Sequence, residues 1–150
     1  MKIASNLLAE LIAHAEEDAP NECCGVVAID PGVLAGVGDA SGGADGAAFA
    51  YATKVHRAEN IAASPLKFEV DGKELLGLIG AIEDDGSELG AIYHSHTRTA
   101  PKPSQTDINF AANWPGVEWI IVGLADGAAP EVRSYLIEGG RVQEVALEVE

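Results

Sequence analysis

Apolar positions along the chain recur with two different periods, which predicts helices interleaved with strands. The first helix is predicted to begin with Ser5 as its N-cap and to end before Pro20, and its apolar stripe is Leu7, Leu8, Leu11 and Ile12. A second helix is predicted over residues 71–85, stopping at Gly86, and its stripe is Leu75, Leu76, Ile79 and Ile82. A short third helix is predicted over residues 104–113.

Strands are predicted where apolar residues run together or alternate. Residues 25–30 and 117–125 form apolar runs, and the alternating Phe49, Tyr51, Thr53 and Val55 indicate one face of another strand. Residues 89–96 form a further strand, and residues 132–138 and 141–149 form a hairpin that turns at Gly139-Gly140. This order predicts an α/β fold with a mixed sheet and helices packed on it.

The chain is expected to form a single domain over residues 1–150, because this length is typical of one domain and 47% of the residues are hydrophobic. A stretch rich in Gly, Ala, Ser and Asp at residues 36–46 is interpreted as a flexible loop, since only a short helix and strand precede it. The pattern leaves the oligomeric state open.

Charge narrows the range of partners. The chain has 24 acidic and 9 basic residues and a net charge of -15. Nucleic acids and anionic membranes attract clustered Lys and Arg, so neither is expected as a partner. The first 20 residues include charged side chains where a secretory signal needs an apolar core, and no apolar run is long enough to span a bilayer. A cytoplasmic protein is therefore expected.

The strongest chemical signal is His94-x-His96, followed by seven residues and then Ser104-x-x-Asp107. Side chains at i and i+2 of a strand share a face, so both imidazoles can reach one ion. Asp107 falls in the first turn of the predicted third helix, where the helix dipole favours a charged carboxylate. Three such ligands and one open position are typical of a catalytic zinc site.

Each half of this motif has a simpler explanation when taken alone. Ser104-x-x-Asp107 is close to a capping box, which needs no metal, and a His-x-His pair is often a surface feature. Their conjunction at this spacing, between a strand and a helix, favours the metal. A zinc deaminase is a different enzyme that uses metal-activated water, but it would need His-x-Glu and Pro-Cys-x-x-Cys, and the sequence has neither.

At these residues the chain resembles the JAMM (Jab/MPN) metalloenzyme family. The family signature also has an upstream Glu, which Glu22 matches, and further likeness runs through Asn60, residues 64–68 and residues 119–123. The resemblance implies a three-layer α/β fold of the JAMM/MPN, cytidine-deaminase-like type. It also implies that His94, His96 and Asp107 hold Zn²⁺, that Glu22 is the general base, and that Ser104 donates a hydrogen bond to the developing oxyanion.

The substrate implied by the resemblance is a ubiquitin-like protein whose Gly-Gly tail is cut at the amide bond that follows it. Only residues 109–116 separate the Asp107 region from the next strand, and this short connection argues against linkage-specific polyubiquitin cleavage. The compact form is more similar to bacterial members that process sulfur-carrier proteins. Two alternatives stay open: a general isopeptidase on lysine-linked conjugates, and a non-catalytic MPN-type binding module.

Four other reactive side chains are given structural roles. Cys23 and Cys24 flank Glu22, and strand alternation predicts one buried thiol without catalytic function, since no nearby cation would activate it. The two adjacent cysteines do not form a disulfide framework. His14 and His56 are interpreted as solvated or hydrogen-bonded residues rather than metal ligands.

Overall fold

A mixed sheet of six strands forms the centre of the protein in the computed structural model, which describes residues 1–30, 50–125 and 129–150. The strand order is β3-β2-β4-β5-β6-β7; β4 and β5 are parallel, and the other neighbours are antiparallel. These strands are β2 (Cys24–Ile29), β3 (Ala52–Ala58), β4 (Glu88–His96), β5 (Glu118–Gly123), β6 (Glu131–Glu138) and β7 (Arg141–Val145).

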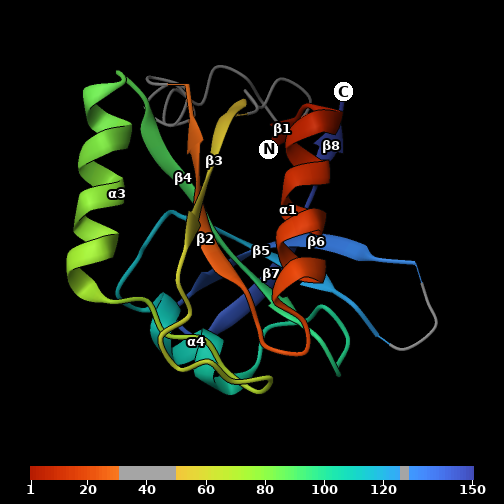
Figure 1. The fold of residues 1–150 in the computed structure, drawn as a ribbon. Coiled ribbons are helices and arrows are strands. Elements are labelled where there is room, and N and C mark those ends of the chain that lie inside the picture. The colour runs from red at the N-terminus through yellow and green to blue at the C-terminus, as the bar shows by residue number, and fades with distance from the viewer. Residues whose placement is uncertain (31–49, 126–128) are drawn as a thin grey trace.

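Helix α1 (Ser5–Asp18) covers one face of this sheet, on the side opposite α3 (Gly72–Asp84) in Figure 1. Its Leu7 and Leu11 pack with residues of β2 and β4 in one core cluster. The predicted end before Pro20 is confirmed, but the predicted cap is wrong. Ser5 is the first residue inside the helix, and the N-cap is Ala4, which has no side chain to accept a hydrogen bond.

Helices α3 and α4 (Gln105–Ala111) lie on the other face and share a second core cluster with β4 and β5. Asp71 caps α3 by accepting a hydrogen bond from the amide of Glu74, and α3 ends before Gly86, which has a φ of 76°. Leu75 and Ile82 are buried as predicted, whereas Leu76 is 70% exposed. The predicted three-layer arrangement of helix, sheet and helix is confirmed.

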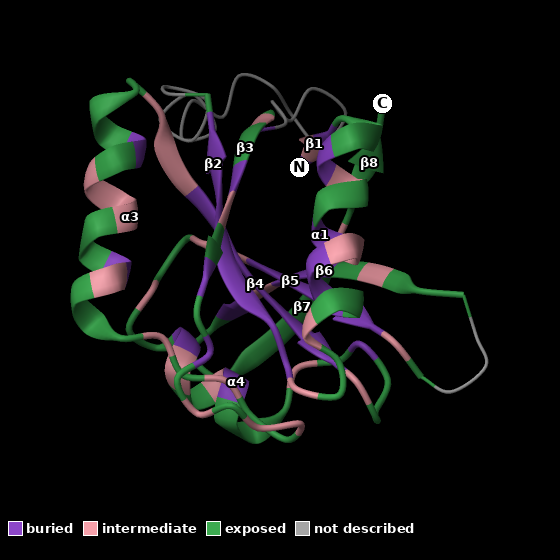
Figure 2. Ribbon diagram, viewed as in Figure 1, coloured by how far each residue is buried: buried purple, intermediate pink, exposed green. Residues whose placement is uncertain are grey.

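The middle strands are the most deeply buried part of the sheet, as the colouring of Figure 2 shows for β2, β4 and β5. Strand β3 lies at one edge of the sheet. The alternation predicted there holds only in part: Val55 is buried, but Tyr51 and Thr53 are exposed. Phe49 and the glycine-rich stretch 36–46 lie outside the described residues.

The hairpin of β6 and β7 turns at Gly139 and Gly140, whose φ values of 58° and 78° explain why glycine occupies both positions. The chain does not continue this hairpin to residue 149 as predicted. It ends instead in β8 (Glu148–Val149), which pairs in parallel with β1 (Lys2–Ile3) in a separate two-stranded sheet. Among the described residues, no helix is long and apolar enough to cross a membrane.

Candidate metal centre

The end of β4 brings the two histidines of the His-x-His motif to one face of the sheet. Ile92 belongs to the core under α3 and α4, and period-2 alternation places His94 and His96 on that same face. Ser95 points to the opposite face. The chain then crosses to α4 through a loop that packs on β5: a Cβ atom on Gly123 would lie 2.8 Å from Cδ of Pro101. Glycine is therefore needed where this loop crosses the sheet.

Three ligand atoms converge between β4 and α4. His94 Nε2 lies 3.1 Å from His96 Nε2 and 3.1 Å from Asp107 Oδ2, and His96 Nε2 lies 3.3 Å from the same oxygen. Ligands about 2.0–2.1 Å from a tetrahedral Zn²⁺ are about 3.3 Å apart, so the spacing suits that ion. All three residues are buried and form a group able to hold a metal. The predicted ligand set is thus brought together.

The hydrogen bond on the far side of His96 fixes the state of its ring. Nδ1 lies 2.9 Å from the carbonyl oxygen of Ala100, which can only accept, so Nδ1 carries a proton. In the neutral ring, the lone pair is then on Nε2 and faces the other two ligand atoms. Burial opposes the charged form of His96, but the hydrogen bonds to Asp107 and Ala100 and the charges of Asp107 and Glu22 together outweigh it and raise the pKa in the metal-free chain.

His94 is fully buried, and burial lowers its pKa despite the opposing effect of Asp107. A neutral ring is the form that binds a metal. Phe68 stacks on this imidazole, with ring centroids 4.5 Å apart and planes 25° from parallel. Among the described residues, Nδ1 of His94 has no hydrogen-bond partner, so this imidazole is held by its Nε2 contacts with Asp107 and His96 and by the stacked ring of Phe68.

Asp107 is held in place by the start of α4. The Ser104 amide donates to Asp107 Oδ2 at 2.8 Å, and the Asp107 amide donates to Ser104 Oγ at 3.1 Å, so the predicted capping box is present. Burial opposes ionisation, but hydrogen bonds from His94, His96 and Ser104 hold the pKa of Asp107 well below its usual range. The capping and metal-binding interpretations are therefore compatible, because one carboxylate makes both sets of contacts.

Glu22 reaches the same site from the other end of the chain, just before β2. Glu22 is only 5% exposed, which is unusual for a carboxylate outside helices and strands. It lines a cavity of about 140 Å³ together with His96, Ser104 and Asp107. Burial is the main reason that the pKa of Glu22 rises to about 7, with the charge of Asp107 adding to the effect and that of His96 opposing it.

Two residues that were not singled out as functional from the sequence connect the segment of Glu22 to the end of β4, the strand that carries His94 and His96. Ser95 Oγ accepts a hydrogen bond from the Cys23 amide at 2.8 Å, and Thr97 Oγ1 donates to the Pro20 carbonyl at 2.9 Å. Strand alternation could have predicted the direction of Ser95, because the middle residue of His-x-His must face away from the metal and toward α1. Its partner on the segment before β2 could not be inferred from spacing.

The remaining reactive residues have structural roles. Both cysteines are buried, so the expectation of one buried thiol is wrong, and burial raises each thiol pKa to about 12. His14 is hydrogen-bonded, with Nδ1 2.7 Å from the Tyr93 hydroxyl. His56 is half-buried on β3 and, within the described part of the chain, its Nε2 lacks a partner. Neither histidine belongs to the metal centre.

Comparison with known proteins identifies relatives over almost the whole chain. Residues 4–138 match the family described as prokaryotic homologs of the JAB domain. The CysO-cysteine peptidase of Mycobacterium tuberculosis is 32% identical over 98% of this chain and 89% of its own length. The desampylase of Haloferax volcanii is 33% identical over 81% of this chain and 78% of its own.

One solved structure supports the fold assignment. The crystal structure of a JAB1/MPN domain protein from Archaeoglobus fulgidus superposes with a TM-score of 0.57 at 20% identity and covers 99% of this chain and 98% of its own. At that identity the likeness supports the fold alone.

Proposed function

The chain is a hydrolase of the prokaryotic JAB domain family, and on that premise we propose that it is a zinc-dependent peptidase that cuts the amide bond after the C-terminal Gly-Gly of a ubiquitin-like or sulfur-carrier protein. The observation that carries the proposal is the geometry of the site. Three ligand atoms lie 3.1–3.3 Å apart, and a buried carboxylate with a raised pKa lines the adjoining cavity.

His94, His96 and Asp107 would hold the Zn²⁺ ion. When bound, this ion supplies water that is nucleophilic near neutral pH and polarises the scissile carbonyl. Glu22 accepts the proton of the attacking water and passes it to the leaving amine. Both transfers need a carboxylate that can accept a proton and return it, and Glu22 is a buried carboxylate that lines the cavity beside the ligands.

Ser104 can cap α4 and also stabilise the reaction. Its oxygen uses a lone pair to accept the amide hydrogen of Asp107, and the hydroxyl hydrogen remains available for donation. Ser104 also lines the cavity, and we infer that it donates this hydrogen to the oxygen on which charge develops. A donor of this kind typically contributes about 3 kcal/mol to the transition state.

The relatives favour two substrate classes for the same chemistry. The mycobacterial relative is named for CysO-cysteine, and its match covers 98% of this chain, which favours a carrier protein that bears a small C-terminal adduct. The name of the Haloferax relative, desampylase, supports a second candidate, cleavage of carrier–protein conjugates. Both substrates have a carrier tail on the acyl side of the cut bond, so they differ in the leaving amine.

The residues beside the cavity supply a surface for the carrier protein. Leu66 lines the cavity and is 74% exposed, and Ile61 in the same connection is 47% exposed. An exposed apolar side chain at the rim of the cavity is a candidate contact for a protein substrate. We infer that the carrier contacts them while its tail enters the cavity.

The first test measures zinc content and activity in the same preparation. The wild type is expected to hold one zinc per chain and to cleave a Gly-Gly carrier with a C-terminal extension. Glu22→Gln is expected to keep the zinc and to lose at least about 100-fold in kcat/KM. A zinc-free wild type, or a Glu22→Gln variant as fast as wild type, would contradict the proposal.

A substrate panel separates the two candidates. It compares one carrier with a single C-terminal cysteine, with a longer linear extension, and with a lysine-linked partner protein. Preference for the cysteine adduct supports the first candidate, whereas preference for the lysine-linked form supports the second. If zinc binds but none of the three is cut, the chain is a metal-containing binding module.

A further inference from the structure

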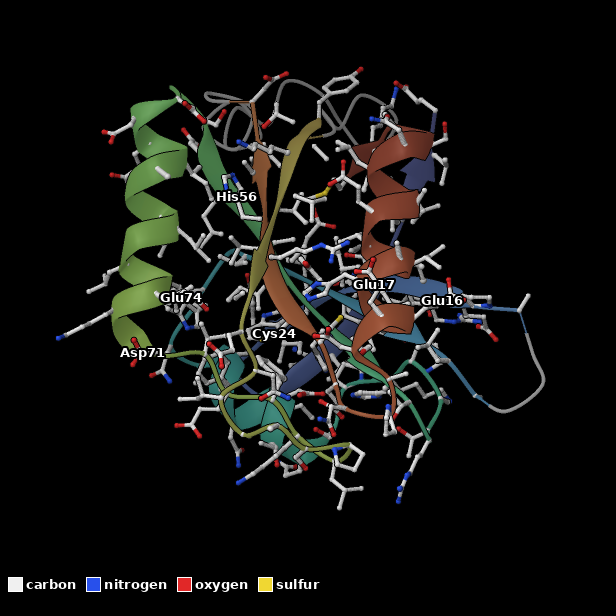
Figure 3. The ribbon with its side chains drawn as sticks, in the orientation of Figure 1. Glu16, Glu17, Cys24, His56, Asp71 and Glu74 are labelled. Carbon is white, nitrogen blue, oxygen red and sulfur yellow. The ribbon has the colours of Figure 1, made fainter. Side chains whose placement is uncertain are left out.

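The connection between β3 and α3 contains a loop, residues 60–69, that lies beside α4 in Figure 1. We call this segment the 60–69 loop. The Ile61 amide donates to the Glu69 carbonyl at 2.9 Å and closes its ends. Its start is anchored by α3, because Glu74 Oε1 accepts from the amide of Glu59 at 2.7 Å; Figure 3 shows Glu74 near the beginning of that helix.

The side chain of Asn60 fills the inside of this loop and makes four hydrogen bonds, all with backbone groups. Its Oδ1 accepts from the amides of Ala62 at 3.1 Å and Glu69 at 3.0 Å. Its Nδ2 donates to the carbonyls of Lys67 at 3.0 Å and Glu22 at 2.9 Å. Asn60 is only 9% exposed, so replacing any of these bonds with water would require the loop to open.

The backbone of Glu22 is held by this loop on both sides. Its amide donates to the Ser64 carbonyl at 2.9 Å, and its carbonyl accepts the hydrogen bond from Asn60. The carboxylate of Glu22 has no hydrogen-bond partner within the described residues. Its position therefore depends on where the loop holds the backbone.

The same loop reaches the metal ligands. Asn60 binds the carbonyl of Lys67, and the next residue, Phe68, stacks on the imidazole of His94. Phe68 also contacts Phe110 of α4 edge to face, with centroids 5.9 Å apart. The side chain of Asn60 thus connects the backbone of Glu22, the predicted base, to the segment of Phe68, which packs on the predicted ligand His94.

We propose that Asn60 is a positioning residue that sets the placement of Glu22 relative to the metal ligands through the 60–69 loop. The inference rests on the proposed role of Glu22 as general base. Asn60 touches no reacting atom, and its effect passes through the Glu22 carbonyl and the loop. A base displaced by about 1 Å can lose on the order of 100-fold in rate, which makes such positioning measurable.

Asn60→Asp is the sharpest substitution, because it removes the two donor bonds while keeping the shape of the side chain, although it also adds a negative charge when ionised. Asp keeps the size and the two acceptor bonds to Ala62 and Glu69, but it sets an oxygen against the carbonyls of Glu22 and Lys67. We expect kcat to fall about 10- to 100-fold and KM to change less than threefold. Zinc affinity, measured by competition with a chelator, should stay within about threefold of wild type.

A double-mutant cycle tests whether the effect passes through Glu22. In a Glu22→Gln background, Asn60→Asp should lower the residual kcat by less than twofold, because the group that Asn60 positions is gone. An equal loss in both backgrounds, or a loss of zinc affinity that matches the loss of kcat, would overturn the proposal.

Ser134→Ala is the control for lost stability. Ser134 is buried on β6 and donates a partly buried hydrogen bond to Glu118 at 2.9 Å. Glu118 begins β5, whereas Gly123, beside His96 at the metal centre, ends it, so the control lies away from the site. We expect a comparable fall in unfolding free energy and an unchanged kcat. If Ser134→Ala lowers kcat as much as Asn60→Asp does, the effect of Asn60 is general destabilisation and the proposal fails.

Amide hydrogen exchange separates this inference from the proposed function. Asn60→Asp should speed exchange of the Glu22 amide in the metal-free protein, while the amides of β5 remain protected. Unchanged exchange at Glu22 would overturn the positioning role. If Asn60→Asp speeds exchange of the Glu22 amide but the wild type cleaves no carrier, the positioning role of Asn60 stands and the peptidase assignment is rejected.

Discussion

The two parts of the candidate site, the metal ligands and Glu22, are built in different ways. His94 and Asp107 are 13 positions apart, on the end of β4 and the first turn of α4, and side-chain contacts connect them. Glu22 belongs to neither a helix nor a strand, and backbone bonds from the 60–69 loop hold it. The ligands therefore depend on regular local structure, whereas Glu22 depends on segments far away in sequence.

This difference leads to distinct expectations for the two parts. Damage to the ligand set should remove the metal and all activity together. Damage around Glu22 should slow the reaction while the metal stays bound. Ser95 and Thr97 connect the two parts. Ser95 of β4 bonds to Cys23, and Thr97, just after β4, bonds to Pro20, so both reach the segment that carries Glu22.

The largest effect is expected from His96→Ala. Removing one of three ligands leaves two, so zinc content should fall from about one per chain to near zero, and kcat/KM should fall at least about 1,000-fold. Metal analysis after dialysis and an activity assay check this. Glu22→Gln serves as the comparison, since it should lose activity at full zinc content. If His96→Ala and Glu22→Gln lose the same amount of zinc, the metal ligands and Glu22 do not have separate roles.

The next effect concerns the stability of the metal-free protein. Burial raises the pKa of Glu22 from 4.5 to about 7, so the folded state binds more protons than the unfolded state between these values. Stability therefore falls as pH rises through this window. Glu22→Gln removes the ionisation and should stabilise the metal-free protein by about 1–3 kcal/mol at pH 8, with a smaller gain at pH 5.5.

Urea unfolding at the two pH values measures this difference. A gain that is equal at pH 5.5 and pH 8 would show that ionisation of Glu22 is not its cause. A loss at both values would show that the glutamine amide is poorly accommodated at the buried position.

Ser95→Ala tests the link between the two parts. It leaves the buried Cys23 amide without its acceptor, which should lower the unfolding free energy by about 1–3 kcal/mol with zinc content unchanged. Thr97→Val removes the more exposed bond to Pro20 and should lower it by less than about 1 kcal/mol. Denaturant unfolding of both variants gives the comparison, and a larger effect at Thr97 would contradict it.

The smallest effect is expected at the surface beside the cavity. Leu66→Asp should raise KM for a carrier substrate about fivefold, or about 1 kcal/mol, with kcat within twofold, if the proposed contact between Leu66 at the cavity and the carrier forms. Leu76→Asp is the matched control, since Leu76 is equally exposed on α3 but does not line the cavity. Steady-state kinetics with an intact carrier would reject the contact if both variants behave alike.

Much of the fold follows from periodicity, and periodicity was least reliable for the exposure of individual side chains. The helix over residues 72–84 and the strand over residues 88–96 were predicted closely, because their apolar residues recur at regular spacing. Leu76 was assigned to the apolar stripe of a helix and Tyr51 to one face of a strand, and both are exposed. Periodicity gives the apolar side of an element, but the number of layers packed against it decides how much of that side is covered.

The candidate site divides in the same way. The ligand set could be predicted because His94, His96 and Asp107 lie on adjacent elements whose geometry relates spacing to direction. The roles of Ser95, Phe68 and Asn60 could not, because each contacts a partner from a distant part of the chain. Their contacts form only when the sheet and the 60–69 loop are assembled.

The sequence by itself determined the alternation of helices and strands, the ligand set and its match to a family motif. These depend on short-range geometry, in which side-chain direction repeats every two or 3.6 residues. The tertiary structure alone decided that Glu22 is buried beside those ligands with a raised pKa and that the 60–69 loop holds its backbone. Burial and desolvation arise from the packing of distant segments, so no local pattern encodes them.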